Sequence, residues 1–301
     1  MSDTRETILS LKKQENAIIL AHNYQPGEVQ EIADFNGDSL ELARRCLDVA
    51  EETIVFCGVY FMAETAKILN PGKTVLLPSE DAGCRMADMA DAQSLKEYRE
   101  KHPDTTVVCY INSTAEVKAL SDVCVTSSNA LTVVRKLAAK RVLFVPDRNL
   151  GSWIAKQLPD TEFDLWPGYC YVHDEITRGN LLEARRNHPG VEIIVHPECP
   201  PEVSEAADRV LSTGQMRSYI SRSDGESFII GTEEGMLYRL ASDNPGKTFY
   251  PVKTSCICED MKRITLPVLE ASLQTGRHRM EVDPAVATDA KRAIDRMLEL
   301  S

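Results

Sequence analysis

The chain has 301 residues, of which 43% are hydrophobic, enough to bury a large core divided among two or three domains. Its 46 acidic and 34 basic side chains give a formal net charge of −12, which would repel a nucleic-acid backbone or an anionic membrane surface. We therefore expect neither partner. The first residues lack the pattern of a secretory signal, and no apolar run is long enough to cross a bilayer, so we expect a cytoplasmic location.

Three similar segments recur along the chain, at residues 22–39, 110–127 and 196–213, and they align without a gap. Each contains Glu-Val at the same place, then a small residue and Asp, and then a hydroxyl residue five positions beyond the Asp. The repeated acids are Glu28, Glu116 and Glu202, and Asp34, Asp122 and Asp208. We expect these acids to serve the fold, as first-turn helix residues and turn residues. Three copies indicate an internally repeated fold.

Each repeat reads as strand, helix, strand, helix, strand along the chain. The first strands are "AIILA", "TVVCY" and "VEIIV", the helical periodicity of "SLELARRCLDVA" and its counterparts follows, and "TIVFCGV", "RVLFVPD" and "SFIIGTE" come next. This alternation predicts parallel strands with crossover helices. We therefore predict an α/β fold of three homologous three-layer α/β/α domains related by a pseudo-threefold axis, with the active site at their junction.

The predicted domains span residues 1–85, 86–171 and 172–256. Residues 257–301 have no counterpart in the repeats and predict a helical tail, with a helix starting at Asp283-Pro284, an N-cap and first-turn pair. We expect this tail to pack on the first domain.

Three cysteines, Cys84, Cys170 and Cys256, are spaced by 86 residues. Ligands of parallel α/β sheets bind outside the carboxyl ends of the strands, so a threefold axis would bring these thiols to one centre. Three thiolates leave a four-coordinate metal, or one iron of a four-iron, four-sulfur cluster, with an open position for a substrate. For the other cysteines packing is the default interpretation. Cys258 stays open as an alternative ligand, because it lies two residues from Cys256.

Polar residues end the first strand of each repeat and would face the same axis. They are His22 and Tyr24, Tyr110 and Asn112, and His196 and Glu198. Histidine and glutamate are the commonest acid–base groups, although a lone histidine is often structural. The hydroxyl residues Ser39, Ser127 and Thr213 are each predicted to begin a helix, where they either bind an anion or act as plain N-caps.

Several segments resemble the quinolinate synthase family: "AHNYQ", "ADFNGDSLELA", "FCGVYFMAETAKILNPGKTVLLP", "DAGCRMADM", "YINSTAEVKALSDVCVTSSNA", "HPECPPEV", "STGQM" and "GTEEGMLYRL". The resemblance covers nearly the whole chain. It implies a transferase of NAD biosynthesis that condenses iminosuccinate with dihydroxyacetone phosphate to quinolinate, phosphate and two waters. It also implies one [4Fe–4S] cluster per chain, with an open iron that acts as a Lewis acid.

The resemblance assigns roles to individual residues. The implied cluster ligands are Cys84, Cys170 and Cys256. The implied substrate-binding residues are His22, Ser39, Tyr110, Ile111, Asn112, Ser127, His196, Pro197, Glu198 and Thr213. The implied catalytic residues are Glu198, His196, Tyr24 and Tyr110, with Glu198 as the principal proton shuttle. An aspartate oxidase or dehydrogenase that supplies iminosuccinate is the expected functional partner.

Two other classes of protein compete with this interpretation. A non-catalytic zinc or iron–sulfur protein would use the cysteines, but it would not need so many acid–base and polar groups converging on them. A phosphosugar enzyme without metal would use the polar groups, but it would not need the spaced cysteines. Iron and sulfide analysis of anaerobically purified protein separates these classes.

Overall fold

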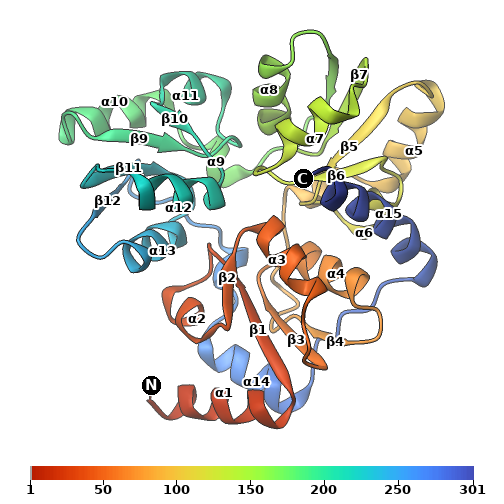
Figure 1. Cartoon of the computed structure of the whole chain (residues 1–301), viewed down its shortest axis with the longest axis vertical. Helices are drawn as coiled ribbons and strands as arrows, with labels where there is room; N and C mark the ends of the chain where they lie inside the picture. The colour runs from red at the N-terminus through yellow and green to blue at the C-terminus, as the bar shows by residue number, and fades with distance from the viewer. Residues whose placement is uncertain (1) are drawn as a thin grey trace.

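The computed structural model describes residues 2–301 and contains three parallel four-stranded sheets, one in each third of the chain. In all three sheets the strands have the same spatial order: β2-β1-β3-β4, β6-β5-β7-β8 and β10-β9-β11-β12. Figure 1 shows the sheets in three lobes around a common centre, the first at the bottom, the second at the upper right and the third at the upper left. The predicted α/β fold with three α/β/α units is confirmed.

The first unit contains α1 (Ser2–Gln14), β1 (Ala17–His22), α2 (Gly27–Ile32), β2 (Phe35–Gly37), α3 (Ser39–Leu47), β3 (Thr53–Cys57), α4 (Tyr60–Leu69) and β4 (Thr74–Leu76). The second contains the 3₁₀ helix η1 (Ala87–Met89), α5 (Ala92–Lys101), β5 (Thr106–Tyr110), α6 (Ala115–Ala119), β6 (Val123–Val125), α7 (Ala130–Leu137), β7 (Arg141–Val145), α8 (Arg148–Gln157), β8 (Glu162–Leu165) and α9 (Tyr171–Asp174).

The third unit contains α10 (Arg178–Asn187), β9 (Glu192–Val195), α11 (Pro201–Ala206), β10 (Arg209–Val210), α12 (Thr213–Arg222), β11 (Ser227–Gly231), α13 (Gly235–Asp243) and β12 (Thr248–Pro251). The tail contains the 3₁₀ helix η2 (Asp260–Lys262), α14 (Leu266–Thr275) and α15 (Pro284–Leu300). The two central strands of each sheet are almost entirely buried, because helices cover both faces of a parallel sheet.

The repeated aspartates close each unit onto its first strand, as predicted for residues that serve the fold. In the third unit, Asp208 Oδ2 accepts the backbone N–H of Ile193 at 2.7 Å, and the N–H of Asp208 donates to the Ile193 carbonyl at 3.0 Å. Asp34 and Asp122 make the same two bonds in the other units. A cation also pairs with each carboxylate, as Arg185 does with Asp208 at 2.8 Å.

The tail packs on the first unit, as expected, only in part, because it divides between two units. Helix α14 packs against α1, whereas α15 packs mainly against α6 and β6 of the second unit. Helix α6 has only five residues. The apolar stripe of α15 covers it, with Ala290, Ala293, Ile294 and Met297 buried.

The hydrophobic cores divide in the same way. Buried residues of the first two units and of the tail form one continuous cluster, while the third unit has two clusters of its own.

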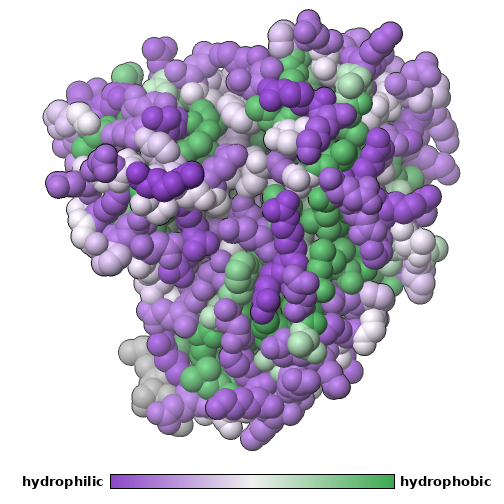
Figure 2. Space-filling view, viewed as in Figure 1, coloured by the Kyte–Doolittle hydropathy of each residue, from purple (hydrophilic) through white to green (hydrophobic). Residues whose placement is uncertain are grey.

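The face in Figure 2 is mostly hydrophilic, with hydrophobic residues showing in a band between the second and first lobes. Within residues 2–301, none of the helices combines the length and apolar character needed to cross a bilayer.

Candidate active site

A cavity with about 740 Å³ of empty space, partly open to solvent, lies where the three units meet. The predicted site residues that line it are His22, Tyr24, Ser39, Cys84, Tyr110, Asn112, Ser127, Cys170, His196, Glu198 and Thr213. Within the part of the chain that the structure describes, three predicted residues lie outside the lining: Ile111, Pro197 and Cys256. The carboxyl ends of strands from all three sheets therefore converge on one site, as expected for parallel α/β units.

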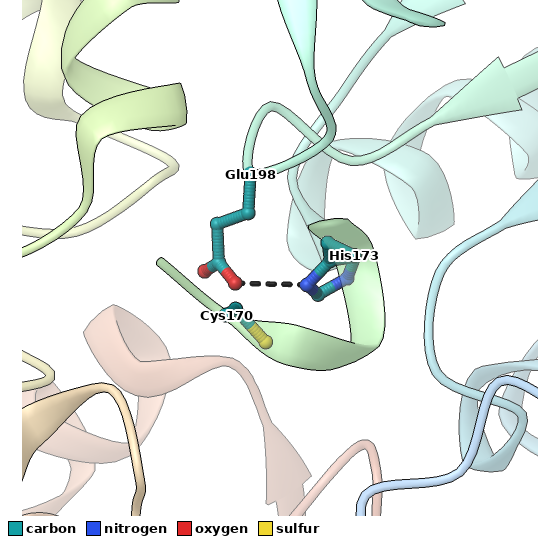
Figure 3. A group of neighbouring side chains, drawn as sticks. All are labelled: Cys170, His173 and Glu198. Atoms are coloured by element: carbon teal, nitrogen blue, oxygen red, sulfur yellow. Dashed lines mark ion pairs between the residues drawn. The ribbon is translucent and has the colours of Figure 1, made fainter. Parts of the chain in front are cut away.

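Glu198 lies at the centre of the polar groups. It follows β9, and its side chain is only 5% exposed. Figure 3 shows its carboxylate facing the His173 ring, with Nδ1 2.9 Å from Oε2, although the two atoms are not aligned for a hydrogen bond. The Tyr110 hydroxyl donates to Oε1, and Nδ1 of His196 lies 3.7 Å from the same oxygen. Burial disfavours the charge on Glu198, but the surrounding histidines and Tyr110 lower its pKa overall, so the carboxylate is ionised.

His173 was not predicted from the sequence. It lies on α9, three residues after Cys170, and its ring stacks on that of His196 with centroids 4.6 Å apart. Its Nε2 hydrogen-bonds to Thr232 Oγ1 at 2.8 Å, which leaves Nδ1 facing Glu198. The repeat comparison could not find His173 because it lies outside the aligned segments; its spacing from Cys170 was the only available signal.

His22 and His196 occupy the same position in two repeats and have the same local geometry. Nδ1 of His22 accepts the backbone N–H of Tyr24 at 3.2 Å, and Nδ1 of His196 accepts that of Glu198 at 3.3 Å. Burial lowers the pKa of both histidines to about 3. Both rings are therefore neutral near pH 7, and the proton lies on Nε2 because Nδ1 is an acceptor.

Two further polar side chains can contact a bound molecule. The Tyr24 hydroxyl pairs with Thr232 Oγ1 at 2.6 Å, and burial followed by the charge of Glu198 raises the Tyr24 pKa, so it stays protonated. Asn112 lines the cavity, and its Oδ1 is buried without a hydrogen-bond partner among the described residues. A buried acceptor without a partner is costly, so this atom fits a donor on a ligand or an ordered water.

Two of the three predicted helix-starting hydroxyls begin helices. Ser39 is the first residue of α3 and Thr213 the first of α12. Ser127 does not begin a helix; helix α7 starts three residues later, at Ala130. Asn129 Oδ1 accepts the N–H of Thr126 at 2.7 Å and closes a turn there, which delays the helix.

A small network beside these hydroxyls joins all three units. Ser128 of the second unit donates to the carboxylate of Asp38 in the first and lies 2.7 Å from Ser212 Oγ in the third. Gly214 allows this approach, because a Cβ there would lie 2.6 Å from Asp38 Oδ2. This network fixes the mutual placement of α3 and α12, whose first residues line the cavity.

Each of the three cysteine loops has an equivalent backbone hydrogen bond, which shows the residues that correspond between the units. In every unit a residue shortly after the third strand donates its N–H, at 2.8 Å, to a carbonyl in the loop after the fourth strand. The pairs are Tyr60 and Ala82, Arg148 and Gly168, and Glu234 and Cys256. In the first two units a cysteine follows two residues after the accepting residue. The equivalent residue in the third unit is Cys258, not Cys256.

The surroundings of the two cysteines agree with this register. Cys258 lines the cavity with Cys84 and Cys170. Burial is the main cause of the raised pKa of Cys84 and Cys170, and the nearby Cys258 thiol raises both values further. Cys256 is buried in a hydrophobic cluster with Cys199. The structure therefore places Cys258, and not the predicted Cys256, in the cavity with Cys84 and Cys170. The loop after β12 is two residues longer than the loop after β8, so equal spacing along the chain does not give equivalent positions in these two units.

The residues that follow these three cysteines contact one another at the mouth of the cavity. The Arg85 guanidinium lies 4.6 Å from the centre of the Tyr171 ring and pairs with Glu259 at 2.6 Å. The Tyr171 hydroxyl accepts the N–H of Glu259 at 3.0 Å. These contacts hold the loops of Cys84, Cys170 and Cys258 beside one another.

The spacing of the donor atoms bears on which metal group would fit. Among the described residues, Cys170, His173 and Glu198 are the only group of three potential ligands whose donor atoms lie within 4.8 Å of one another. Three thiolates on one zinc ion would place their sulfurs about 3.8 Å apart, given a Zn–S distance near 2.3 Å. Cys84, Cys170 and Cys258 are spread more widely than that, so they fit a polynuclear cluster better than one ion.

Comparison with known proteins agrees with the resemblance. A family model described as "Quinolinate synthetase A protein" matches residues 6–299. A quinolinate synthase of Thermodesulfovibrio yellowstonii is 50% identical over 297 residues, covering 99% of this chain and 98% of the relative. A quinolinate synthase of Methanoregula boonei is 51% identical over 303 residues and covers both chains fully, and one of Dehalococcoides mccartyi is 51% identical over 293 residues. The chain therefore belongs to the quinolinate synthetase A family.

Proposed function

We propose that this protein is a quinolinate synthase of NAD biosynthesis and acts in the cytoplasm. It would condense iminosuccinate with dihydroxyacetone phosphate to give quinolinate, phosphate and two waters. An aspartate oxidase or dehydrogenase would supply iminosuccinate. The observation that carries this proposal is the convergence, in one cavity, of three cysteines from equivalent loops with Glu198, His173 and Tyr110.

The proposed cofactor is one [4Fe–4S] cluster, held by Cys84, Cys170 and Cys258. Burial raises the pKa of all three thiols, that of Cys84 to about 12, so the metal-free protein keeps them protonated and cluster binding releases protons. When bound, the cluster supplies a Lewis-acidic iron with an open position, which can assist the departure of hydroxide.

Proton transfer is proposed to centre on Glu198. Ring closure and two dehydrations require protons to leave carbon and nitrogen and to reach departing oxygens. Ionised Glu198 can accept such a proton, with His173 2.9 Å from one carboxylate oxygen and Tyr110 donating to the other. His196, which is neutral, can donate from Nε2. The side chains already in the cavity can thus accept and donate protons in several steps, without an acid or base from the solvent.

The remaining polar groups are proposed to bind and orient the substrates. Neutral His22 can donate from Nε2, Tyr24 stays protonated as a donor, and Asn112 offers a free acceptor. Ser39 and Thr213 begin α3 and α12, where free N–H groups and the helix dipole favour a carboxylate or phosphate. Ser127 would contribute its hydroxyl from the turn, and Ile111 and Pro197 stay predictions as backbone neighbours of the polar groups.

The test is product formation by anaerobically purified protein. Iminosuccinate generated in the assay and dihydroxyacetone phosphate should yield quinolinate, detected by mass spectrometry, and omission of either should abolish it. The same preparation should contain about four irons and four sulfides per chain. Stoichiometric zinc would overturn the cluster assignment, and a cluster-loaded protein that forms no quinolinate would favour a sensor over an enzyme.

A further inference from the structure

Beneath the loop of Cys258 lies a buried ion pair that the proposed chemistry does not use. Lys262 Nζ lies 2.8 Å from Oε1 and 3.1 Å from Oε2 of Glu233. Glu233 follows β11, and its side chain is 1% exposed, whereas that of Lys262 is 22% exposed. A carboxylate buried this deeply needs hydrogen-bond donors for both of its oxygens. The donors to these oxygens therefore identify the segments of the chain that the ion pair holds in place.

Both oxygens of Glu233 accept backbone N–H groups. Oε1 accepts the N–H of Cys258 at 3.1 Å, and Oε2 accepts the N–H of Gly235 at 2.7 Å. One carboxylate thus ties the third cysteine to the start of α13. Truncation of Glu233 would leave both N–H groups and the Lys262 ammonium without these partners.

Lys262 extends the connection to the first unit. Its Nζ donates to the carbonyl of Tyr24 at 2.6 Å. Gly235 lies against the same peptide, since a Cβ there would come within 2.7 Å of Tyr24 C and O. The backbone of Tyr24, whose side chain lines the cavity, is therefore held between the pair and α13.

The equivalent positions of the other two units lack this carboxylate–lysine pair. At the position of Glu233 the second unit has Asp147, a fully buried carboxylate that accepts the N–H of Leu150 at 2.8 Å, and the first unit has Val59. Neither has a lysine from another segment beside it among the described contacts. By the same hydrogen-bond register, the third cysteine loop is as long as the first and two residues longer than the second, and a longer loop loses more entropy when it is ordered.

We propose that Glu233 and Lys262 are a positioning pair that holds the Cys258 loop and the Tyr24 peptide in the geometry required for cluster binding. The inference rests on the proposed function, because it takes Cys258 as a cluster ligand. Glu233 is among the residues that line the cavity, but in this role the pair does not act on the substrate directly. It acts through the backbone of Cys258 and Tyr24.

The first test uses full-length metal-free protein and therefore does not depend on activity. Cys258 and Cys84 are alkylated with iodoacetamide under denaturant-free conditions, and their labelling rates are compared by peptide mass spectrometry. Glu233→Ala and Lys262→Met should each raise the ratio of Cys258 to Cys84 labelling about tenfold, since the N–H anchor is lost or weakened. Glu234→Gln, an exposed neighbour in the chain, is the matched control and should leave the ratio unchanged.

Glu233→Gln guards against a variant that fails to fold. It keeps an oxygen that can accept the Cys258 N–H but removes the charge that Lys262 pairs with. Its labelling ratio should lie between those of wild type and Glu233→Ala. A folded Glu233→Ala or Lys262→Met protein with the wild-type ratio would overturn the proposal, and so would a Glu233→Gln ratio above that of Glu233→Ala.

The second test uses the cluster-loaded protein under anaerobic conditions. Release of iron to a ferrous chelator should be about tenfold faster in either single variant, as is typical when a group supporting a ligand is removed. Because the two residues act as one unit, the double variant should be little faster than the single ones. Wild-type protein that binds no cluster would refute the proposed cofactor yet leave the labelling test valid. Unchanged labelling and release in the variants would refute the pair alone.

Discussion

The backbone N–H of Glu234 donates to the carbonyl of Cys256 at 2.8 Å, and this bond gives Cys256 the position that Ala82 and Gly168 occupy in the other units. Cys258 is consequently the residue of the third unit that is equivalent in position to Cys84 and Cys170. Equivalent cysteines are therefore identified by the hydrogen bonds of their loops and not by their spacing along the chain. The bond also distinguishes the positions of Cys256 and Cys258, which are only two residues apart.

The first prediction compares those two cysteines. Cys258→Ser should abolish the cluster, because it removes one of only three protein ligands, while Cys256→Ser should retain it. Iron and sulfide content after anaerobic reconstitution measures both outcomes, and Cys124→Ser, a buried packing residue, is the control. A protein that kept a full cluster without Cys258 and lost it without Cys256 would refute the register argument.

The sequence carried part of this information. The repeats themselves are offset by 88 residues between His22 and Tyr110 but by 86 between Tyr110 and His196. Loops between repeats can therefore change length, and the equal spacing of three cysteines was not required by the fold. Only the hydrogen bonds around the loops show where the extra residues lie. A periodic pattern predicts strands and helices well, but it does not fix loop registers, which depend on tertiary contacts.

The second prediction concerns Glu198. Glu198→Gln keeps the shape of the side chain but removes its basicity, so turnover should fall by roughly a hundredfold or more. Cluster content should not change. The matched control is Glu202→Gln, an exposed first-turn residue of α11 that is four positions along the chain. Quinolinate formation under single-turnover conditions is the measurement, and near-normal rates in the Glu198 variant would exclude its role in proton transfer.

The polar residues of the site were easier to predict than their partners. His22 and Tyr110 end the first strands of their sheets, and Glu198 follows the first strand of the third sheet. The carboxyl ends of parallel strands must meet at one edge, so the convergence of these residues followed from the fold class. His173 was missed because it lies outside the aligned segments, and the residues three positions after Cys84 and Cys258 are Ala87 and Met261 rather than histidines. The bond between Ser128 and Asp38 was missed for another reason: contacts between units depend on how the units pack, which no local pattern encodes.

The third prediction addresses the fold. Asp208→Ala removes the acceptor of the Ile193 N–H and the partner of Arg185, so the third unit should lose about 1–3 kcal/mol of stability. Asp208→Asn should lose less, because its side-chain oxygen can still accept that N–H. Hydrogen exchange at Ile193, together with thermal unfolding, reports the effect. Asp224→Ala, at an exposed position of the same unit, should be neutral, and equal stability of the two alanine variants would show that Asp208 does not close the repeat.

The fourth prediction concerns pH and rests on His22 and His196. Burial lowers the pKa of each from 6.5 to about 3 in the folded protein. Between these values the unfolded chain binds more protons than the folded chain, so the free energy of unfolding must fall as the pH falls. Each histidine can contribute a slope of up to about 1.4 kcal/mol per pH unit.

Denaturant unfolding of the metal-free protein at pH 5, 6 and 7.5 measures this slope. The range stays above the pH at which Glu198 would protonate, because its pKa is lowered. His22→Asn should flatten the dependence, since the variant carries one fewer group that must stay neutral in the folded state. His188→Asn, whose ring stacks on Tyr250 outside the cavity lining, should keep the wild-type slope. If His22→Asn and wild type lost stability in parallel between pH 7.5 and 5, His22 would not be held neutral, and Nε2 could not serve as the neutral donor proposed for substrate binding.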